Sequence, residues 1–239
     1  MANQNTLSRA VAIESITQPE DFGPFFDVCA KAFGTQTSDG IWTGANPGWN
    51  TPDGKSQGAA RLAARWHATK DANNTHFLKA SSIIEGAPQI VGVAIWVNAS
   101  LVPGCGDIPD PLDFSSLYPD NEREQRYITQ VIGSMQTRRR QVLEEKCSAA
   151  SAQKSVMVLD LCASDPDFQR RGIASKLVNW GLDEAVRLGG IEAITEASVM
   201  GRTVYKRLGF TEIEEIQYEV DEEFENRERP SNVFLRTRP

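Results

Sequence analysis

The sequence predicts an α/β (α+β) fold, with a mixed, mostly antiparallel central sheet and helices on both of its faces. Three observations indicate this class. Two neighbouring strand patterns form a hairpin, a buried strand runs through a turn into an amphipathic helix, and the elements follow in the order β-α-α-β-β-insertion-β-α-β-α-β-β. We expect a single domain over residues 1–239, with a helical insertion at about residues 100–150 that precedes the buried strand.

The first third of the chain predicts one strand and two helices around a long loop. Ala10 to Ile16 is expected as a short strand. Pro19 to Phe33 is expected as a helix, because a proline opens it, two acids follow in the first turn and phenylalanines recur along one side. Gly34 to Gly58 is rich in Gly, Thr, Asn and Pro, which is typical of a loop, and Ala59 to Ala72 returns to a helical pattern.

The central third combines a hairpin with the insertion. His76 to Ile84 and Gln89 to Asn98 are expected as antiparallel strands, and the second lacks polar alternation, which indicates burial on both faces. Leu101 to Pro119 is irregular, whereas Glu122 to Cys147 has the apolar spacing of one long helix. The insertion has too little hydrophobic material to fold alone, so we expect it to pack beside the core.

A strand, turn and helix unit carries the strongest chemical signal. Val156 to Ala163 is almost entirely apolar, and from Ala174 onward apolar residues recur at three- and four-residue steps. Between them, Gln169 to Ala174 fits the pattern Q-x-x-G-x-A/G, with its glycine at Gly172. A helix start has unpaired N–H groups and partial positive charge, so this turn is predicted to hold phosphate oxygens.

The last part of the chain predicts three further strands and one helix. Ile191 to Thr195 is expected as a strand and Met200 to Leu208 as a helix. Thr211 to Val220 and Val233 to Thr237 are expected as the closing strands. The connection between these two strands, residues 221–230, is acidic and contains arginines, so we expect a solvated linker.

Composition limits the classes of function. With 239 residues, 40% of them hydrophobic and 24% charged, the chain is globular. No apolar run reaches the length of a membrane span and the start lacks a signal-peptide pattern, so a soluble, cytoplasmic protein with no membrane partner is expected. The cysteines are scattered and the chain has 2 histidines, which predicts neither a zinc site nor a disulfide framework nor metal dependence. The net charge of −7 argues against nucleic acid as a partner.

Two segments together resemble a known family. The strand, turn and helix resemble motif A of the GNAT superfamily, the acetyl-CoA-dependent N-acetyltransferases. Glu196 to Phe210, EASVMGRTVYKRLGF, is similar to motif B of that family, with its Y-x-x-L-G-F ending. The match is close over about Val156 to Val220, and the turn has neither the P-loop lysine nor the paired glycines of a dinucleotide site. The resemblance implies an acyltransferase that uses acetyl-CoA as co-substrate, with splayed strands at the coenzyme site.

The resemblance also implies a set of coenzyme contacts. The pantetheine arm would lie along the end of the buried strand, where one N–H faces the thioester oxygen, and the pyrophosphate would lie on the N–H groups of the turn. Ser164 stands where motif A usually has a valine, and Ser198 and Arg202 occupy the region where motif B often has an asparagine. The implied contacts are Cys162, Ala163, Ser164, Gln169, Arg170, Arg171, Gly172, Ile173, Ala174, Ser175, Arg202 and Tyr205.

Three residues are candidates for proton transfer. Tyr205 matches the family tyrosine that donates its phenolic proton to the departing thiolate, although a helix tyrosine can also simply pack on a sheet. Asp160 lies inside an apolar strand, where an unpaired carboxylate would have a raised pKa, so it either has a partner or acts as the general base. Glu196, at the end of the next strand, is the second candidate base.

The expected acceptor is a primary amine of a small molecule, which attacks directly in a ternary complex. Trp42 and Trp49 in the long loop either form a wall of the acceptor pocket or pack beneath the loop. The run Arg138 to Arg140 either binds the 3′-phosphate of the coenzyme or forms a solvated helix face. The alternatives are a protein lysine or N-terminal acetyltransferase, and a non-catalytic acyl-CoA-binding or scaffolding protein of the same fold. A monomer or a homodimer is expected.

Overall fold

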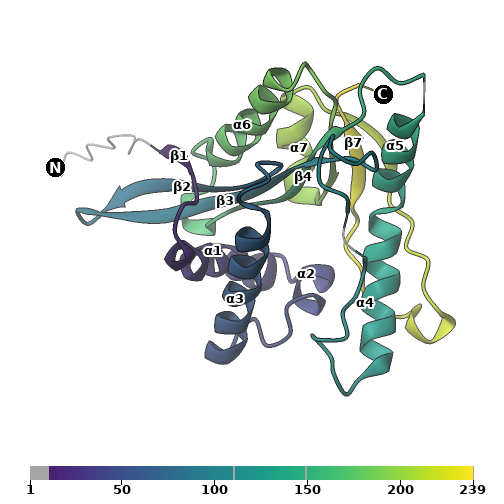
Figure 1. The fold of residues 1–239 in the computed structure, drawn as a ribbon. Coiled ribbons are helices and arrows are strands. Elements are labelled where there is room, and N and C mark those ends of the chain that lie inside the picture. The colour runs from purple at the N-terminus through teal and green to yellow at the C-terminus, as the bar shows by residue number, and fades with distance from the viewer. Residues whose placement is uncertain (1–10, 110, 149, 239) are drawn as a thin grey trace.

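Seven strands form one sheet in the order β1-β2-β3-β4-β5-β7-β6 in the computed structural model, which describes residues 11–109, 111–148 and 150–238 (Figure 1). Every neighbouring pair is antiparallel except β4 and β5, so the predicted mixed, mostly antiparallel sheet is confirmed. The strands are β1 (Ala12–Ser15), β2 (Thr75–Ile84), β3 (Ala87–Ala99), β4 (Val156–Ser164), β5 (Ala193–Ala197), β6 (Thr211–Glu215) and β7 (Val233–Arg236). Ala10, the predicted start of the first strand, lies outside the described residues.

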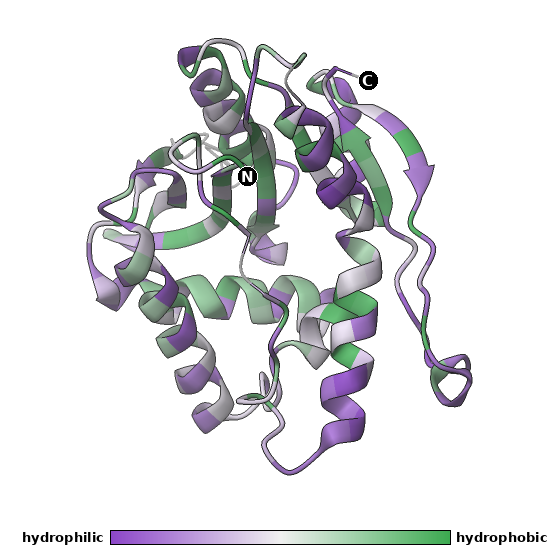
Figure 2. Cartoon of the chain, turned by 45° about the vertical axis from the view of Figure 1, so that its right-hand side comes forward, coloured by the Kyte–Doolittle hydropathy of each residue, from purple (hydrophilic) through white to green (hydrophobic). Residues whose placement is uncertain are grey.

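Helices cover both faces of this sheet (Figure 1). The helices are α1 (Phe22–Cys29), α2 (Gly40–Gly44), α3 (Pro52–Thr69), α4 (Glu122–Met135), α5 (Thr137–Cys147), α6 (Ile173–Arg187) and α7 (Val199–Arg207). Residues of α6 and α7 pack on one face, whereas α1, α3 and α5 pack on the other. Figure 2 shows hydrophobic residues concentrated in the central strands, as this layered arrangement requires. No helix in the described ranges is both long and apolar enough to cross a membrane.

The predicted loop from Gly34 to Gly58 is wrong in part. A π-helical segment, Ala30–Gln36, extends α1, and α2 and the start of α3 also lie within this stretch. The hydroxyl of Thr51 accepts a hydrogen bond from the Gly54 N–H, and Pro52 and Asp53 follow at the first helical positions. A capping threonine, a proline and an acid in this order start a helix, so α3 begins at Pro52 instead of the predicted Ala59.

The insertion contains two helices instead of the predicted single one. The helix is interrupted between α4 and α5 at Gln136, whose backbone is not helical. The hydroxyls of Ser134 and Thr137 donate back to the carbonyl oxygens of Gln130 and Gly133 at 2.8 and 3.1 Å. Such side-chain hydrogen bonds compete with the helix ladder and bend helices, and these two flank the interruption.

The connection between β6 and β7, residues 216–232, is not the predicted solvated linker. The side chain of Phe224 is fully buried, with its ring 5.2 Å from the ring of Tyr127 in α4. Arg126 of α4 pairs with Asp221, and Arg227 of the connection pairs with Glu124 of α4. A polar composition suggested a linker, but one buried aromatic ring and complementary charges fix this connection to the insertion.

A tryptophan fixes α6 on the sheet. The side chain of Trp96 in β3 is fully buried, and its indole N–H donates to the Leu177 carbonyl oxygen at 3.1 Å. A Cβ atom at Gly181 would lie 2.0 Å from the Trp96 ring, so only glycine allows this close approach. The contact holds the helix that follows the Gly172 turn at a fixed distance from β3 and β4.

Candidate active site

The parallel strands β4 and β5 separate part of the way along their length. Their paired residues end at Leu159 and Thr195, although β4 continues to Ser164 and β5 to Ala197. The hydroxyl of Thr195 donates to the Leu159 carbonyl oxygen at 3.0 Å, at the last paired position. Beyond this point no described residue of β5 pairs with β4, which leaves the backbone of β4 from residue 160 to 164 open on that side.

A β-bulge in β4 lies at the same place. The register with β3 changes from Ile95 opposite Leu161 to Trp96 opposite Leu159, so Asp160 is the extra residue. A bulge places two consecutive side chains on one face of a sheet. Asp160 therefore points toward α3 and α5, together with the neighbouring Leu161.

Asp160 belongs to a network of two carboxylates and two guanidinium groups. Arg65 Nη1 of α3 lies 2.8 Å from Asp160 Oδ2, and Arg139 Nη1 of α5 lies 2.7 Å from Asp160 Oδ1. Arg139 also donates through Nε to Glu196 Oε1 at 3.1 Å, and through Nη2 to the second oxygen of that carboxylate. One arginine of the insertion thus joins β4 to β5 directly beyond the point where their pairing ends.

This network gives Asp160 the partners that the first of its two interpretations requires. Burial alone would raise the pKa of Asp160, but the attraction of Arg65 and Arg139 outweighs it and holds the pKa below its ordinary value. An unpaired carboxylate with a raised pKa is therefore wrong, and the buried, partnered carboxylate is found instead. Within the run Arg138 to Arg140, the side chain of Arg139 is 12% exposed and pairs with Asp160, whereas Arg140 is exposed.

The turn before α6 has the backbone geometry that the sequence predicted. Gly172 caps the helix with a φ of 77°, in the left-handed region, and no side chain caps the first N–H groups. A Cβ atom at Gly172 would meet nothing within 4 Å, so space lies open above the turn. The side chain of Arg171 lies over the Phe168 ring, and the side chain of Gln169 exchanges hydrogen bonds with Gln36. The turn therefore presents main-chain N–H groups and the positive end of α6.

The structure brings Tyr205 of α7 to Cys162 of β4. Tyr205 is buried, and burial together with the neighbouring Cys162 thiol raises its pKa well above the ordinary value. Burial also raises the pKa of Cys162 to about 12, so this thiol stays protonated. Ser164, at the end of β4, has a buried hydroxyl with no partner among the described residues. Arg202 lies further along, where its Nη2 donates to the Ser231 carbonyl oxygen at 2.7 Å.

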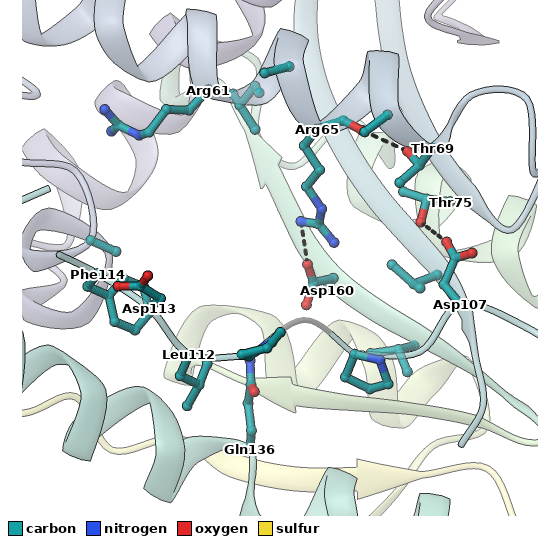
Figure 3. A pocket seen from close by; sticks show the side chains of 18 of the residues that line it. Arg61, Arg65, Thr69, Thr75, Asp107, Leu112, Asp113, Phe114, Gln136 and Asp160 are labelled. Carbon is teal, nitrogen blue, oxygen red and sulfur yellow. Dashed lines mark hydrogen bonds and ion pairs between the residues drawn. The ribbon is translucent and has the colours of Figure 1, made fainter. Parts of the chain in front are cut away.

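A cavity of about 950 Å³ opens on the bulge of β4 (Figure 3). Its walls come from α3, from the insertion and from the strands, and Asp160 and Arg139 lie among its lining residues. The ionisable side chains among its described lining residues are Arg61, Arg65, Asp107, Asp113, Arg139 and Asp160. The sequence analysis missed Arg61, Arg65 and Asp107, although an acid inside an apolar strand is a signal that a cation must lie nearby.

The two tryptophans of the predicted pocket wall are not among the lining residues of this cavity. The ring of Trp42 lies 5.5 Å from that of Phe26 and 5.8 Å from that of Phe33. Trp49 packs against Trp42 and covers Gly34, where a Cβ atom would lie 2.4 Å from its ring. This arrangement agrees with the alternative in which the tryptophans pack beneath the loop, and not with a wall of this cavity.

The fold and the site together define a class of protein. A sheet in which β4 and β5 separate beside an uncapped helix start, with a tyrosine near the end of β4, is the arrangement that the resemblance to the GNAT superfamily implies. Residues 124–222 match the model of the acetyltransferase (GNAT) domain family. A search of curated protein sequences found no match.

Solved structures share this fold along almost the whole chain. A mosquito arylalkylamine N-acetyltransferase like 5b is 14% identical, with 95% of this chain and 99% of that chain covered at a TM-score of 0.62. Arylalkylamine N-acetyltransferase 2 from Aedes aegypti is 18% identical, with 95% and 97% covered at a TM-score of 0.60. An agmatine N-acetyltransferase is 13% identical, with 95% and 97% covered at a TM-score of 0.59. The resemblance to the GNAT superfamily is thereby confirmed, and the chain has the fold of this superfamily.

Proposed function

We propose that this protein is an N-acetyltransferase that transfers the acetyl group of acetyl-CoA to a primary amine of a small molecule by direct attack in a ternary complex. The observation that carries the proposal is the cavity that opens on the bulge at Asp160, next to the separation of β4 and β5. Acceptor and thioester must meet at such a point. The match to the acetyltransferase domain and the likeness to proteins named for arylalkylamines and agmatine support it.

The backbone supplies the contacts that acetyl-CoA needs. Cys162, Ala163 and Ser164 offer main-chain groups to the amides of the pantetheine arm, because β4 pairs only with β3 there and is open on the side of β5. One N–H of this segment faces the thioester oxygen and stabilises the charge that develops on it. Residues 170–175 hold the diphosphate, since their N–H groups lie at an uncapped helix start with open space above Gly172.

Tyr205 assists the departure of the thiolate. Its raised pKa keeps the hydroxyl fully protonated at neutral pH, so it always has a hydrogen to donate. A raised pKa also makes the phenol a weaker acid, and the thiolate, with an ordinary pKa of about 8.5, takes the proton only with the help of a close hydrogen bond. The role of Tyr205 is therefore that of a fixed donor at the end of β4.

Asp160 and Glu196 hold the two strands in place in this proposal. A carboxylate with a lowered pKa that is paired with Arg65 and Arg139 is a weak base, so water molecules in the cavity remove the proton of the incoming ammonium. The walls around the cavity favour a small molecule over a peptide. We place the reaction in the cytoplasm, without a metal ion, in a monomer or a homodimer.

The substitution Tyr205→Phe tests the proposal. A broad panel of amines is screened by the release of free CoA, and acetyl-CoA binding is measured by calorimetry. We expect turnover to fall about a hundredfold while acetyl-CoA binding is kept. Tyr127→Phe, in α4, is the matched control and is expected to keep full turnover. If the wild type binds acetyl-CoA but acetylates no amine of the panel, the result contradicts a small-molecule acceptor and supports the non-catalytic alternative.

A further inference from the structure

Most of the charge that lines the cavity is already neutralised within the protein. Arg65 and Arg139 pair with Asp160, and Arg139 also pairs with Glu196 behind the cavity wall. This network holds two positive and two negative groups, so it leaves no net charge for a ligand. Among the described residues, the charged cavity side chains outside the network are Arg61 of α3 and two acids of the insertion loop, Asp107 and Asp113.

Arg61 is a guanidinium group without a carboxylate partner among the described residues. Its Nη2 donates to Asn46 Oδ1 at 3.1 Å, and Asn46 Nδ2 donates to the Trp42 carbonyl oxygen at 2.9 Å. The second bond fixes the amide so that its oxygen faces the arginine. Arg61 is therefore held in one orientation by a neutral group, with most of its five N–H donors unused.

A partly buried cation in this position favours an anion. Burial lowers the pKa of Arg61, because the charged form loses contact with water. An amide oxygen does not compensate a full charge, whereas a carboxylate binds the planar fork through two parallel hydrogen bonds. Figure 3 shows Arg61 on the cavity wall, on the same helix as Arg65.

The two arginines lie one helical turn apart on the cavity wall. Arg61 and Arg65 are four residues apart on α3, so their Cα atoms lie about 6 Å apart along the helix axis. Arg65 pairs with Asp160 at the bulge, and the proposed function places the reacting amine there. An acceptor that reaches from Arg61 to the bulge must therefore carry its anion and its amine at opposite ends.

We infer that the acceptor carries an anionic group, such as a carboxylate, that binds Arg61 at the far side of the cavity from its reacting amine. The inference rests on the proposed function and narrows its substrate class. It favours amino acids and related amino carboxylates over amines with a neutral tail. Asp107, which accepts hydrogen bonds from Asn74 and Thr75 and has no cation within 4 Å among the described residues, leaves the amine end of the cavity acidic.

The experiment compares matched amines that differ in one group. Each carboxylate is paired with its primary amide, from glycine and glycinamide to 5-aminopentanoate and 5-aminopentanamide, and kcat/KM is measured with acetyl-CoA. We expect at least one pair in which the wild type prefers the carboxylate by about ten- to a hundredfold. Arg61→Met should abolish that preference, and Arg61→Lys should keep part of it because the charge stays but the fork is lost.

Controls separate this inference from the proposed function. Lys55→Met removes a positive charge from the outer side of the same helix, where Lys55 pairs with Asp27, and should keep the preference. Calorimetry measures the binding of the same amines in the presence of CoA, so it tests Arg61 even if no amine is acetylated. Binding that depends on Arg61 without any acetylation would contradict only the proposed function. Equal use and equal binding of carboxylates and amides by the wild type overturn the inference. The inference is also overturned if Arg61→Met loses affinity for CoA as much as for the amines, because that result would assign the arginine to the coenzyme.

Discussion

Replacing Arg139 with glutamine is expected to destabilise the protein and to do so in a pH-dependent way. Arg139 is the cation within 4 Å of Glu196 in the described part of the chain, and Glu196 is only 3% exposed. Removing one partner of a buried ion pair costs about 3–5 kcal/mol, because the remaining charge is left uncompensated. Against a total free energy of unfolding of about 5–15 kcal/mol, this is a large fraction. For a chain of this length it corresponds to a decrease in Tm of roughly 6–20 °C.

The pH dependence follows from the lowered pKa of Asp160. In the wild type, its ion pairs stabilise the fold above its unfolded-state pKa of about 3.9, and this contribution is lost as the pH falls toward the lower folded-state pKa. In Arg139→Gln the pKa of Asp160 moves back toward the ordinary value. The difference in unfolding free energy between the two proteins should therefore be complete at pH 7 and shrink below about pH 4.

Urea unfolding of both proteins across this pH range measures the difference. Arg140→Gln is the matched control, because Arg140 is exposed and a surface substitution changes stability by about 0.5 kcal/mol or less. The reasoning is refuted if Arg139→Gln unfolds within about 1 kcal/mol of this control at pH 7. It is also refuted if the difference between the variant and the wild type grows as the pH falls.

Two other substitutions test the turn and the aromatic cluster. Gly172→Ala should lower the free energy of unfolding by about 1–2 kcal/mol, because its φ is left-handed, and should weaken acetyl-CoA binding in calorimetry since the methyl group enters the open space above the turn. Gly86→Ala, with a similar φ and equally open space, should show the same loss of stability without the loss of acetyl-CoA binding. Equal acetyl-CoA binding by both variants would contradict a diphosphate site at Gly172. Trp42→Ala should cost about 3 kcal/mol in thermal or urea unfolding and leave the KM for the amine unchanged. A raised KM at full stability would instead make Trp42 a pocket residue.

The motif around Gly172 could be predicted from the sequence because its requirements are local. A left-handed residue before a helix favours glycine, and the apolar spacing of α6 marks which side faces the sheet. The start of α3 was equally local, since Thr51, Pro52 and Asp53 form a readable cap, but the glycine-rich composition of the surrounding stretch outweighed it.

The ionic network could not be predicted from the sequence in the same way. Arg65 lies 95 residues from Asp160 along the chain and Arg139 lies 21 residues away, so no local pattern links them. The sequence indicated that Asp160 needed a partner, and only the packing of α3 and α5 identifies it. The position of Trp42 could not be predicted from a local pattern either, because it depends on contacts with Phe26 and Phe33 that only the fold brings about.

The attachment of the β6–β7 connection to α4 has a consequence for how the chain is made. Arg227 and its partner Glu124 are separated by 103 residues. At about 5–20 residues per second, a ribosome completes α4 roughly 5–20 s before it reaches Arg227. During that interval Tyr127 and Ile128 lack the cover that Phe224 provides. Transiently exposed apolar surface promotes aggregation, so synthesis at low temperature or with chaperones should raise the soluble yield.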